Sequence, residues 1–321
     1  MAEPLYLPSN ISPMVRKFGE RLALVRSPKT AESYVRGART LEQFVEATDI
    51  DLSSAHRGLL DDFVEWMTHR GLNPATIGLM CVGARRYIEW RRKNGEEIPL
   101  IDGPDLPKVH GKGIVTLSDN QLARFLGGAC TWNDPIATMM LLLPMTGMRG
   151  LEIVQLEVSD LVKHGSICAL KVLGKGRKYR WCPLGPQARA IMARYYKKRL
   201  EVRGDSSLMF PGRQDMTRPD LVNRARALRK AVMRIGLQIG ISGLHPHMLR
   251  KTYITYLDAR GVSPLMIAQL VGHGSVGQGL DESMRVTVKH YVGHQLDALA
   301  SVIEKITFPS PVKMESVHEQ D

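Results

Sequence analysis

Apolar residues in the first third of the chain recur at helical spacing, and this pattern predicts a compact helical unit over residues 13–95. Ser27-Pro28 is typical of a helix start. A second helix is predicted from about Gly58 and a third from Asn73-Pro74. The apolar positions that define the three helices are Tyr34, Leu41, Phe44 and Val45, then Leu59, Leu60, Phe63, Val64 and Met67, then Ile77, Met80, Ala84, Tyr87, Ile88 and Trp90.

The helical periodicity stops after residue 95. The next eighteen residues, EEIPLIDGPDLPKVHGKG, contain three prolines and three glycines. Such a composition indicates a linker, which we place at 96–115. Residues 1–12 are predicted to be an N-terminal extension, and a second domain is predicted over 116–293.

The second domain reads as mostly helical with a small sheet. Two short β-like runs, 167–173 and 178–183, are joined by Gly174-Lys175-Gly176-Arg177, which indicates a hairpin. A C-terminal helix is predicted over 294–308 and a tail over 309–321. The predicted helices of the domain itself cover residues 119–128, 134–146, 186–203, 219–238, 247–260 and 263–271. The fold class is therefore mainly α with a small β-sheet.

The charge is distributed unevenly along the chain. Lys and Arg number 44 against 32 acidic residues, a net charge of +12. Residues 1–110 hold fifteen of each sign, so the whole excess lies in residues 111–321. A positive field confined to one part of a chain favours a polyanionic partner, most simply nucleic acid, although solubility charge is the alternative.

The remaining composition excludes several classes of protein. Four scattered cysteines without a CxxC pair suggest neither a zinc ribbon nor a disulfide framework. The N-terminus lacks a signal-peptide pattern. The most apolar run, residues 136–145, is too short to cross a bilayer. We therefore expect a soluble cytoplasmic protein with no membrane partner.

Four separated motifs carry candidate chemistry. Arg149 and Glu152 lie in TGMRGLE, directly after a very apolar helix, and Lys175 lies at the predicted hairpin tip. His247 and Arg250 stand three residues apart, on one face of a helix that begins near Pro246. Each motif also has a structural interpretation: an Arg–Glu pair at a helix start, an exposed turn lysine, and a capping histidine beside a surface arginine.

The fourth motif is Val271-Gly272-His273, followed after a glycine-rich gap by His290-Tyr291. A tyrosine at a helix edge is more often a packing residue than a nucleophile. In this order, however, the motifs resemble the tyrosine recombinase, or phage integrase, family. The resemblance extends over residues 116–306, and the SPKTAESY segment of the first unit looks like the start of that family's core-binding domain.

The resemblance implies a role for each matching residue. It implies that Arg149 and Arg250 grip the scissile phosphate, that Tyr291 is the nucleophile, and that Glu152 supports the site. The other catalytic residues that it implies are Lys175, His247 and His273. Two positions depart from the family pattern: Lys251 stands where a histidine is usual, and Tyr291 follows His273 by eighteen residues, farther than is typical.

The chemistry of these residue types fits phosphodiester cleavage. Two arginines can neutralise the non-bridging oxygens in the transition state. A mobile lysine can protonate the leaving 5′ oxygen, and a tyrosine can carry the DNA 3′ end as a phosphotyrosine. No carboxylate cluster accompanies the motifs, so we expect no metal and no nucleotide cofactor.

The expected partner is a double-stranded DNA recombination site. The predicted DNA-contacting residues are basic positions of the first unit and of the hairpin, namely Arg85, Arg86, Arg91, Arg92, Lys93, Arg177 and Lys178. The C-terminal helix has an apolar stripe of Leu296, Leu299, Val302, Ile303 and Ile306. It could fold back on its own domain, but the resemblance favours its exchange between subunits of a tetramer on two paired sites.

Because little chain precedes residue 13, we expect a simple, Xer-like recombinase without an arm-site-binding domain, serving integration, excision or resolution of a mobile element or replicon. Two alternatives stay open. One is a type IB topoisomerase-like enzyme, which nicks and reseals one strand. The other is a DNA-binding relative without catalysis.

Overall fold

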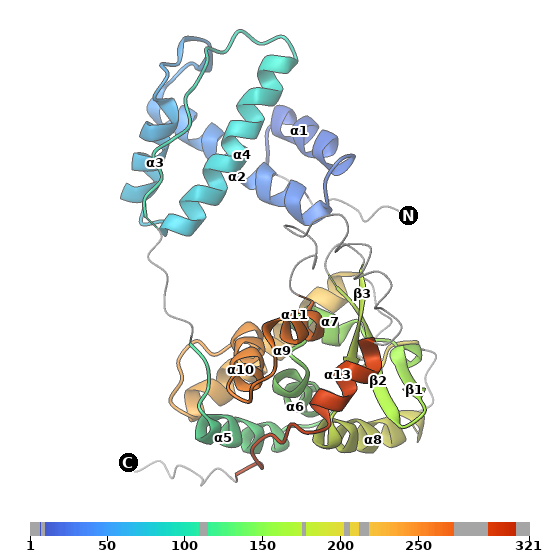
Figure 1. The fold of residues 1–321 in the computed structure, drawn as a ribbon. Helices are drawn as coiled ribbons and strands as arrows, with labels where there is room; N and C mark the ends of the chain where they lie inside the picture. The colour runs from blue at the N-terminus through green and yellow to red at the C-terminus, as the bar shows by residue number, and fades with distance from the viewer. Residues whose placement is uncertain are drawn as a thin grey trace. The chain divides into compact units, whose positions relative to one another are not determined.

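The computed structural model describes residues 7, 10–108, 115–174, 178–201, 206–211, 218–272 and 295–312. The chain divides into two compact units, residues 1–111 and 112–321. Figure 1 shows the elements of both units. The first is helical and the second combines helices with a three-stranded sheet, so the predicted fold class is confirmed.

The first unit contains four α-helices and one 3₁₀ turn among its described residues. Three of the helices begin in the same way, because Ser12, Ser27 and Asn73 each cap a helix whose first residue is proline. Such a cap accepts a backbone N–H that would otherwise have no partner, and proline fits the first helical position. The elements are α1 (Pro13–Ala23), α2 (Pro28–Thr48), η1 (Leu52–Ser54), α3 (Leu59–His69) and α4 (Pro74–Lys93).

Helices α2 and α4 cross at two glycines. A Cβ atom on Gly37 would lie 2.5 Å from the carbonyl oxygen of Met80, and one on Gly83 would lie 2.6 Å from that of Tyr34. Both distances are shorter than any Cβ contact allows, so only glycine permits this approach. The core beside the crossing contains Phe18, Phe44, Phe63 and Tyr87.

The segment predicted as a linker is partly packed on the first unit. Ile98 is buried in that unit's core. The backbone N–H of Asp102 donates to the carbonyl of Arg57 at 2.9 Å, and that of Asp105 donates to Asp61 Oδ1 at 2.7 Å. Residues 98–105 therefore belong structurally to the helical unit.

The second unit adds a sheet to its helices. Strands β1 (Leu161–His164), β2 (Ile167–Leu173) and β3 (Tyr179–Pro183) are antiparallel in the order β1-β2-β3. Neither strand β1 nor the short helix α7 was predicted from the sequence. The described helical elements are α5 (Asp119–Cys130), α6 (Ile136–Thr146), α7 (Gly150–Val154), η2 (Val158–Asp160), α8 (Pro186–Glu201), α9 (Arg218–Gln238), α10 (Pro246–Asp258), α11 (Pro264–Val271) and α13 (Gln295–Ile303).

Helix α6 forms the centre of the second unit. Every residue from Ala137 to Thr146 is buried, and the helix packs against α5, α8, α9 and α10 (Figure 1). A helix that is apolar on all sides is stable in water only when other elements surround it. The end of α6 therefore lies at a fixed position, from which the next residues enter the candidate site.

The C-terminal helix α13 lies against β3 of its own unit (Figure 1). Its residues Leu299 and Ile303 are buried in the unit's core, together with Ile306 and Phe308 beyond the helix. In this single chain the predicted apolar stripe thus packs on its own domain, and its exchange between subunits stays a prediction. No helix in the described part of the chain is both long and apolar enough to span a membrane.

Candidate active site

The end of α6 places the first candidate arginine. Gly147 follows the helix with a φ of 61°, and a Cβ atom there would come within 2.4 Å of the Tyr253 ring. Only glycine fits this left-handed turn. The turn leads directly to Arg149, which precedes α7 and whose side chain is about one-third exposed, at 35%.

Glu152 holds three arginines around one buried carboxylate. Its Oε1 accepts from Arg149 Nη1 at 2.6 Å, and its Oε2 accepts from the Arg149 backbone N–H at 2.9 Å and from Arg180 Nη2 at 2.7 Å. Arg250 Nη1 lies 3.9 Å from Oε2. Burial favours a higher pKa for Glu152, but the hydrogen bonds and charges of Arg180 and Arg149 outweigh it and lower the pKa. The cluster therefore keeps a net positive charge.

Arg250 is completely buried in this cluster. Its Nη1 donates to the carbonyl of Gly147 at 2.7 Å and its Nη2 donates to the carbonyl of Val271. Its Nε is the one buried side-chain nitrogen or oxygen without a partner among the described residues. Burial, and then the charge of Arg149, lowers its pKa to about 10, so it stays protonated at neutral pH. An unpartnered buried N–H is costly, so Arg250 retains one hydrogen-bond donor that its protein neighbours do not use.

The two histidines of HPHMLR lie at the start of α10. The His245 and His247 rings stack with centroids 6.4 Å apart. His247 is exposed one turn before the buried Arg250. Partial burial lowers the pKa of His247, and the charges of Lys251, Arg250 and Arg149 lower it further. At neutral pH its imidazole is therefore uncharged, with one nitrogen that donates and one that accepts.

Four predicted site residues lie outside the described residues: Lys175, Arg177, His273 and Tyr291. The residues next to two of them are described. A Cβ atom on Gly174, which precedes Lys175, would lie 3.9 Å from Glu152 Oε1. Gly272, which precedes His273, has a φ of 65°, and a Cβ atom there would lie 3.0 Å from Arg180 Cδ. The chain therefore reaches the Glu152 cluster at both points.

Arg180 was not predicted as a site residue. It lies two positions before Cys182 on β3, and this period-two pattern was the available signal. Because Cys182 is buried, a basic residue on the same face of the strand needs a hydrogen-bond acceptor inside the protein. Its side chain is only 10% exposed, because it ends on Glu152.

The predicted DNA-contacting residues of the first unit differ from one another in environment. Arg85 and Arg86 are exposed and both pair with Glu89. Arg91 is partly buried and bound to Glu96 at 2.5 Å, with its guanidinium over the Tyr87 ring. These contacts give Arg91 a structural role in the first unit. Arg92, Lys93 and, in the second unit, Lys178 are exposed.

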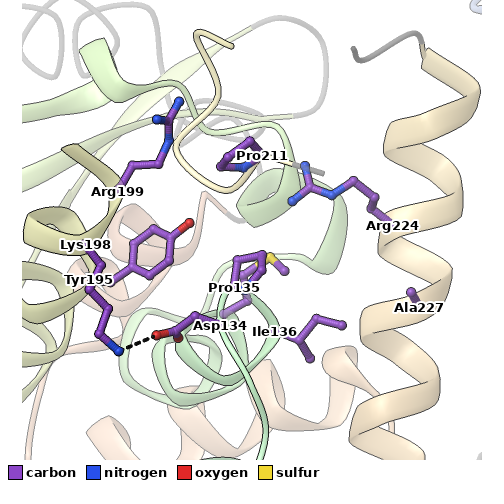
Figure 2. Close-up of a pocket in the computed structure, with 10 residues that line it drawn as sticks. Asp134, Pro135, Ile136, Tyr195, Lys198, Arg199, Pro211, Arg224 and Ala227 are labelled. Atoms are coloured by element: carbon purple, nitrogen blue, oxygen red, sulfur yellow. Dashed lines mark hydrogen bonds and ion pairs between the residues drawn. The ribbon is translucent and has the colours of Figure 1, made fainter. Parts of the chain in front are cut away.

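A cavity of about 630 Å³ lies elsewhere in the second unit, at the opposite end of α6 (Figure 2). Lys198 pairs with Asp134 there at 3.4 Å, and the Tyr195 hydroxyl donates to the carbonyl of Met209. Arg199 donates to the carbonyl of Ser206 at 2.6 Å. Tyr195 and Arg199 therefore bind the backbone of residues 206–209. Within the described ranges no group of three or more His, Cys, Asp or Glu residues is arranged to hold a metal ion.

Fold and site together define a mainly α protein in which Arg149, Arg180 and Arg250 surround the buried Glu152 carboxylate. The phage integrase family model matches residues 116–278, slightly more than half of the chain. The chain therefore belongs to the phage integrase family of tyrosine recombinases, and the predicted family is confirmed.

Two curated relatives match most of the chain. Tyrosine recombinase XerC of Corynebacterium glutamicum is 28% identical over 286 residues, which cover 84% of this chain and 86% of the relative. Tyrosine recombinase XerD of Pseudomonas aeruginosa is 26% identical over 281 residues, which cover 82% and 90%.

Solved structures show the same fold. The XerH site-specific recombinase in its post-cleavage complex with a palindromic difH substrate matches with a TM-score of 0.63 at 18% identity, covering 87% of this chain and 85% of that one. A lambda integrase dimer bound to a COC′ core site matches with a TM-score of 0.62 at 15% identity, and the match covers 84% of this chain and 97% of that chain.

Proposed function

We propose that this protein is a site-specific DNA recombinase that cleaves and rejoins DNA through a 3′-phosphotyrosine intermediate. The observation that carries the proposal is the cluster around Glu152, where a buried Arg250 keeps an unpartnered Nε beside Arg149 and a neutral His247. Such fixed donors suit an oxygen on which negative charge develops. Residues 13–95 would form the core-binding domain and residues 116–293 the catalytic domain.

The proposed reaction transfers the scissile phosphoryl group from the 5′ oxygen of the DNA to the Tyr291 oxygen. The Tyr291 hydroxyl attacks the phosphorus and releases its proton to water, the bond to the 5′ oxygen breaks, and Lys175 gives that oxygen a proton. Arg149 and Arg250 neutralise the non-bridging oxygens, and His247 and His273 donate further hydrogen bonds. The energy of the phosphodiester is kept in the phosphotyrosine, so a 5′ hydroxyl can later attack it and reseal the strand.

Lys175 as general acid leads to a sharp prediction. The substrate is a nicked DNA duplex. Its sequence is first identified by incubating the protein with randomised duplexes and sequencing the DNA that becomes covalently attached. Lys175→Ala is expected to form the adduct about 10²–10⁴-fold more slowly, the usual contribution of a general acid. Most of the rate should return when sulfur replaces the 5′-bridging oxygen, because a thiolate leaves without a proton. The measurement is the single-turnover rate on both duplexes.

The matched control is Lys178→Ala, three residues farther along and exposed. It is expected to weaken DNA binding without selective rescue by sulfur. If Lys175→Ala is equally slow on both duplexes, Lys175 binds DNA instead of donating the proton.

The two alternatives give different products. A topoisomerase-like enzyme would form the adduct but exchange no strands between two duplexes. A DNA-binding relative without catalysis would form no adduct. The Glu152 cluster favours an enzyme, since a protein that only binds DNA gains nothing from a buried arginine with an unpartnered donor.

The proposed partners are a duplex DNA site and further copies of this chain. A related structure is described as a lambda integrase tetramer bound to a Holliday junction, and we infer a similar tetramer on two paired sites. Exchange of α13 between subunits would have to break its present contacts, including the two bonds of 2.7 and 2.8 Å between Arg189 and Glu304. Integration, excision and resolution fit this site equally.

A further inference from the structure

Arg180 joins three parts of the candidate site without being exposed to a substrate. Its Nη2 donates to Glu152 at 2.7 Å and its Nε donates to the carbonyl of Leu270 at 3.0 Å. It therefore connects β3, α7 and the end of α11. Both of these donors are bound to acceptors within the protein, whereas Arg250 keeps an unpartnered Nε.

The end of α11 depends on this arginine. The last carbonyls of a helix have no partner within the helix, and cations stabilise that end. Here the carbonyl of Leu270 accepts from Arg180 and that of Val271 accepts from Arg250. Gly272 then packs directly on the Arg180 side chain. Arg180 thus holds the last described residue before His273.

Arg180 also determines which cations Glu152 can bind. Oε2 of Glu152 is occupied by Arg180 and by the Arg149 backbone, while Arg250 Nη1 stays 3.9 Å away. Without Arg180, Oε2 of the buried carboxylate would keep the Arg149 backbone N–H, and Arg250 would be the nearest cationic side chain left to it. Arg250 would then be drawn toward Glu152 and away from an incoming phosphate.

We propose that Arg180 is a positioning residue for DNA cleavage, which keeps Glu152 from capturing Arg250 and fixes the chain next to His273. This inference rests on the proposed recombinase function. It assigns to β3 a role that none of the sequence motifs indicated.

The test compares Arg180→Met and Arg180→Lys with the native full-length chain on the self-selected nicked duplex. Arg180→Met is expected to form the adduct about tenfold to a hundredfold more slowly, which is the range for the loss of one charge-assisted hydrogen bond. Binding of the uncleaved duplex should stay within a few-fold of native. Arg180→Lys keeps the charge but cannot reach both acceptors, so an intermediate rate is expected.

The pH profile separates positioning from simple loss of stability. Arg180 helps to hold the pKa of Glu152 low. In Arg180→Met that pKa rises, Glu152 is protonated at a higher pH, and the acidic limb of the cleavage profile moves upward. A purely structural defect would scale the rate equally at every pH. Arg260→Met, at the opposite end of α10 and paired with Asp119, is the matched control and should leave rate and profile unchanged.

The outcomes are distinct. If the native chain forms no adduct, the recombinase function fails and this inference fails with it. If the native chain reacts and both Arg180 variants match its rate and pH profile, only the role of Arg180 is wrong. If Arg180→Met does not fold, the test rests on Arg180→Lys. The proposal is overturned if Arg180→Lys forms the adduct at the native rate and with the native pH profile.

Discussion

Replacing Glu152 by glutamine is expected to lower the free energy of unfolding of the second unit by about 3 kcal/mol or more, because removing one partner of a buried ion pair leaves a buried charge uncompensated. The buried Arg250 and the nearly buried Arg180 would both lose their counter-charge. Cleavage should fail as well, since Arg149 loses the carboxylate that orients it. Urea unfolding measures the stability, and the adduct assay measures the cleavage.

The matched control is Glu304→Gln. Glu304 also pairs with an arginine through two bonds, but its side chain is half exposed, at 51%. An exposed pair contributes about 0–1 kcal/mol, so this variant should unfold almost as the native chain does. If both variants lower the free energy of unfolding by the same amount, the Glu152 cluster stabilises the fold no more than an exposed ion pair does.

The acid dependence of stability follows from the same group. The pKa of Glu152 is lowered in the folded chain, so its contribution is complete above the ordinary glutamate pKa. The contribution is lost as the pH falls through the folded value. Glu152→Gln has no such group, and the difference in stability between it and the native chain should therefore shrink in acid.

Ending the chain at Gly293 is expected to prevent stable folding of the second unit. The deleted part contains Leu299, Ile303, Ile306 and Phe308, all within one core. Truncating a single buried residue of this size costs about 2–5 kcal/mol, and a domain has only about 5–15 kcal/mol to lose. Limited proteolysis and thermal unfolding measure the outcome.

A chain ending at Val312 is the control for that deletion. It keeps the stack of Phe308 on Tyr256 and the two hydrogen bonds between Phe308 and Gln187. It also keeps the bond from the Val312 N–H to the carbonyl of Ala123. This chain should unfold at the native temperature. If the shorter chain does so too, α13 is dispensable in its own unit, as a helix that docks on a neighbouring subunit would be.

The sequence predicts most helices because their starts are marked locally. Ser27-Pro28, Asn73-Pro74 and the capping box at Ser118 each specify a helix start through nearby atoms alone. The five residues of α7 and the four of β1 are too short to show a period. They form because α6 and β2 hold the adjoining chain.

Some residues of the candidate site could likewise be predicted from local motifs, and others could not. Arg149, Glu152, His247 and Arg250 carry their signal in short motifs, whereas Arg180 depends on contacts 28 residues away at Glu152 and 90 residues away at Leu270. The orientation of the apolar stripe on α13 also depends on residues far away in the sequence, namely the core of the second unit, which buries Leu299 and Ile303, and Arg189, which pairs with Glu304. Spacing along a single segment can place Arg180 on the same face of β3 as Cys182, but it does not identify the distant residues that Arg180 contacts.

Covalent capture from randomised duplex DNA tests the central claim most directly. The native chain is incubated in EDTA with nicked duplexes that carry a randomised stretch. Denatured protein is then recovered, and the attached DNA and the modified residue are identified. The account predicts one enriched sequence joined through its 3′ phosphate to Tyr291, and no adduct from Tyr291→Phe although that variant still binds the selected duplex. An adduct on another residue, or enrichment of bound DNA without any covalent product, would contradict it.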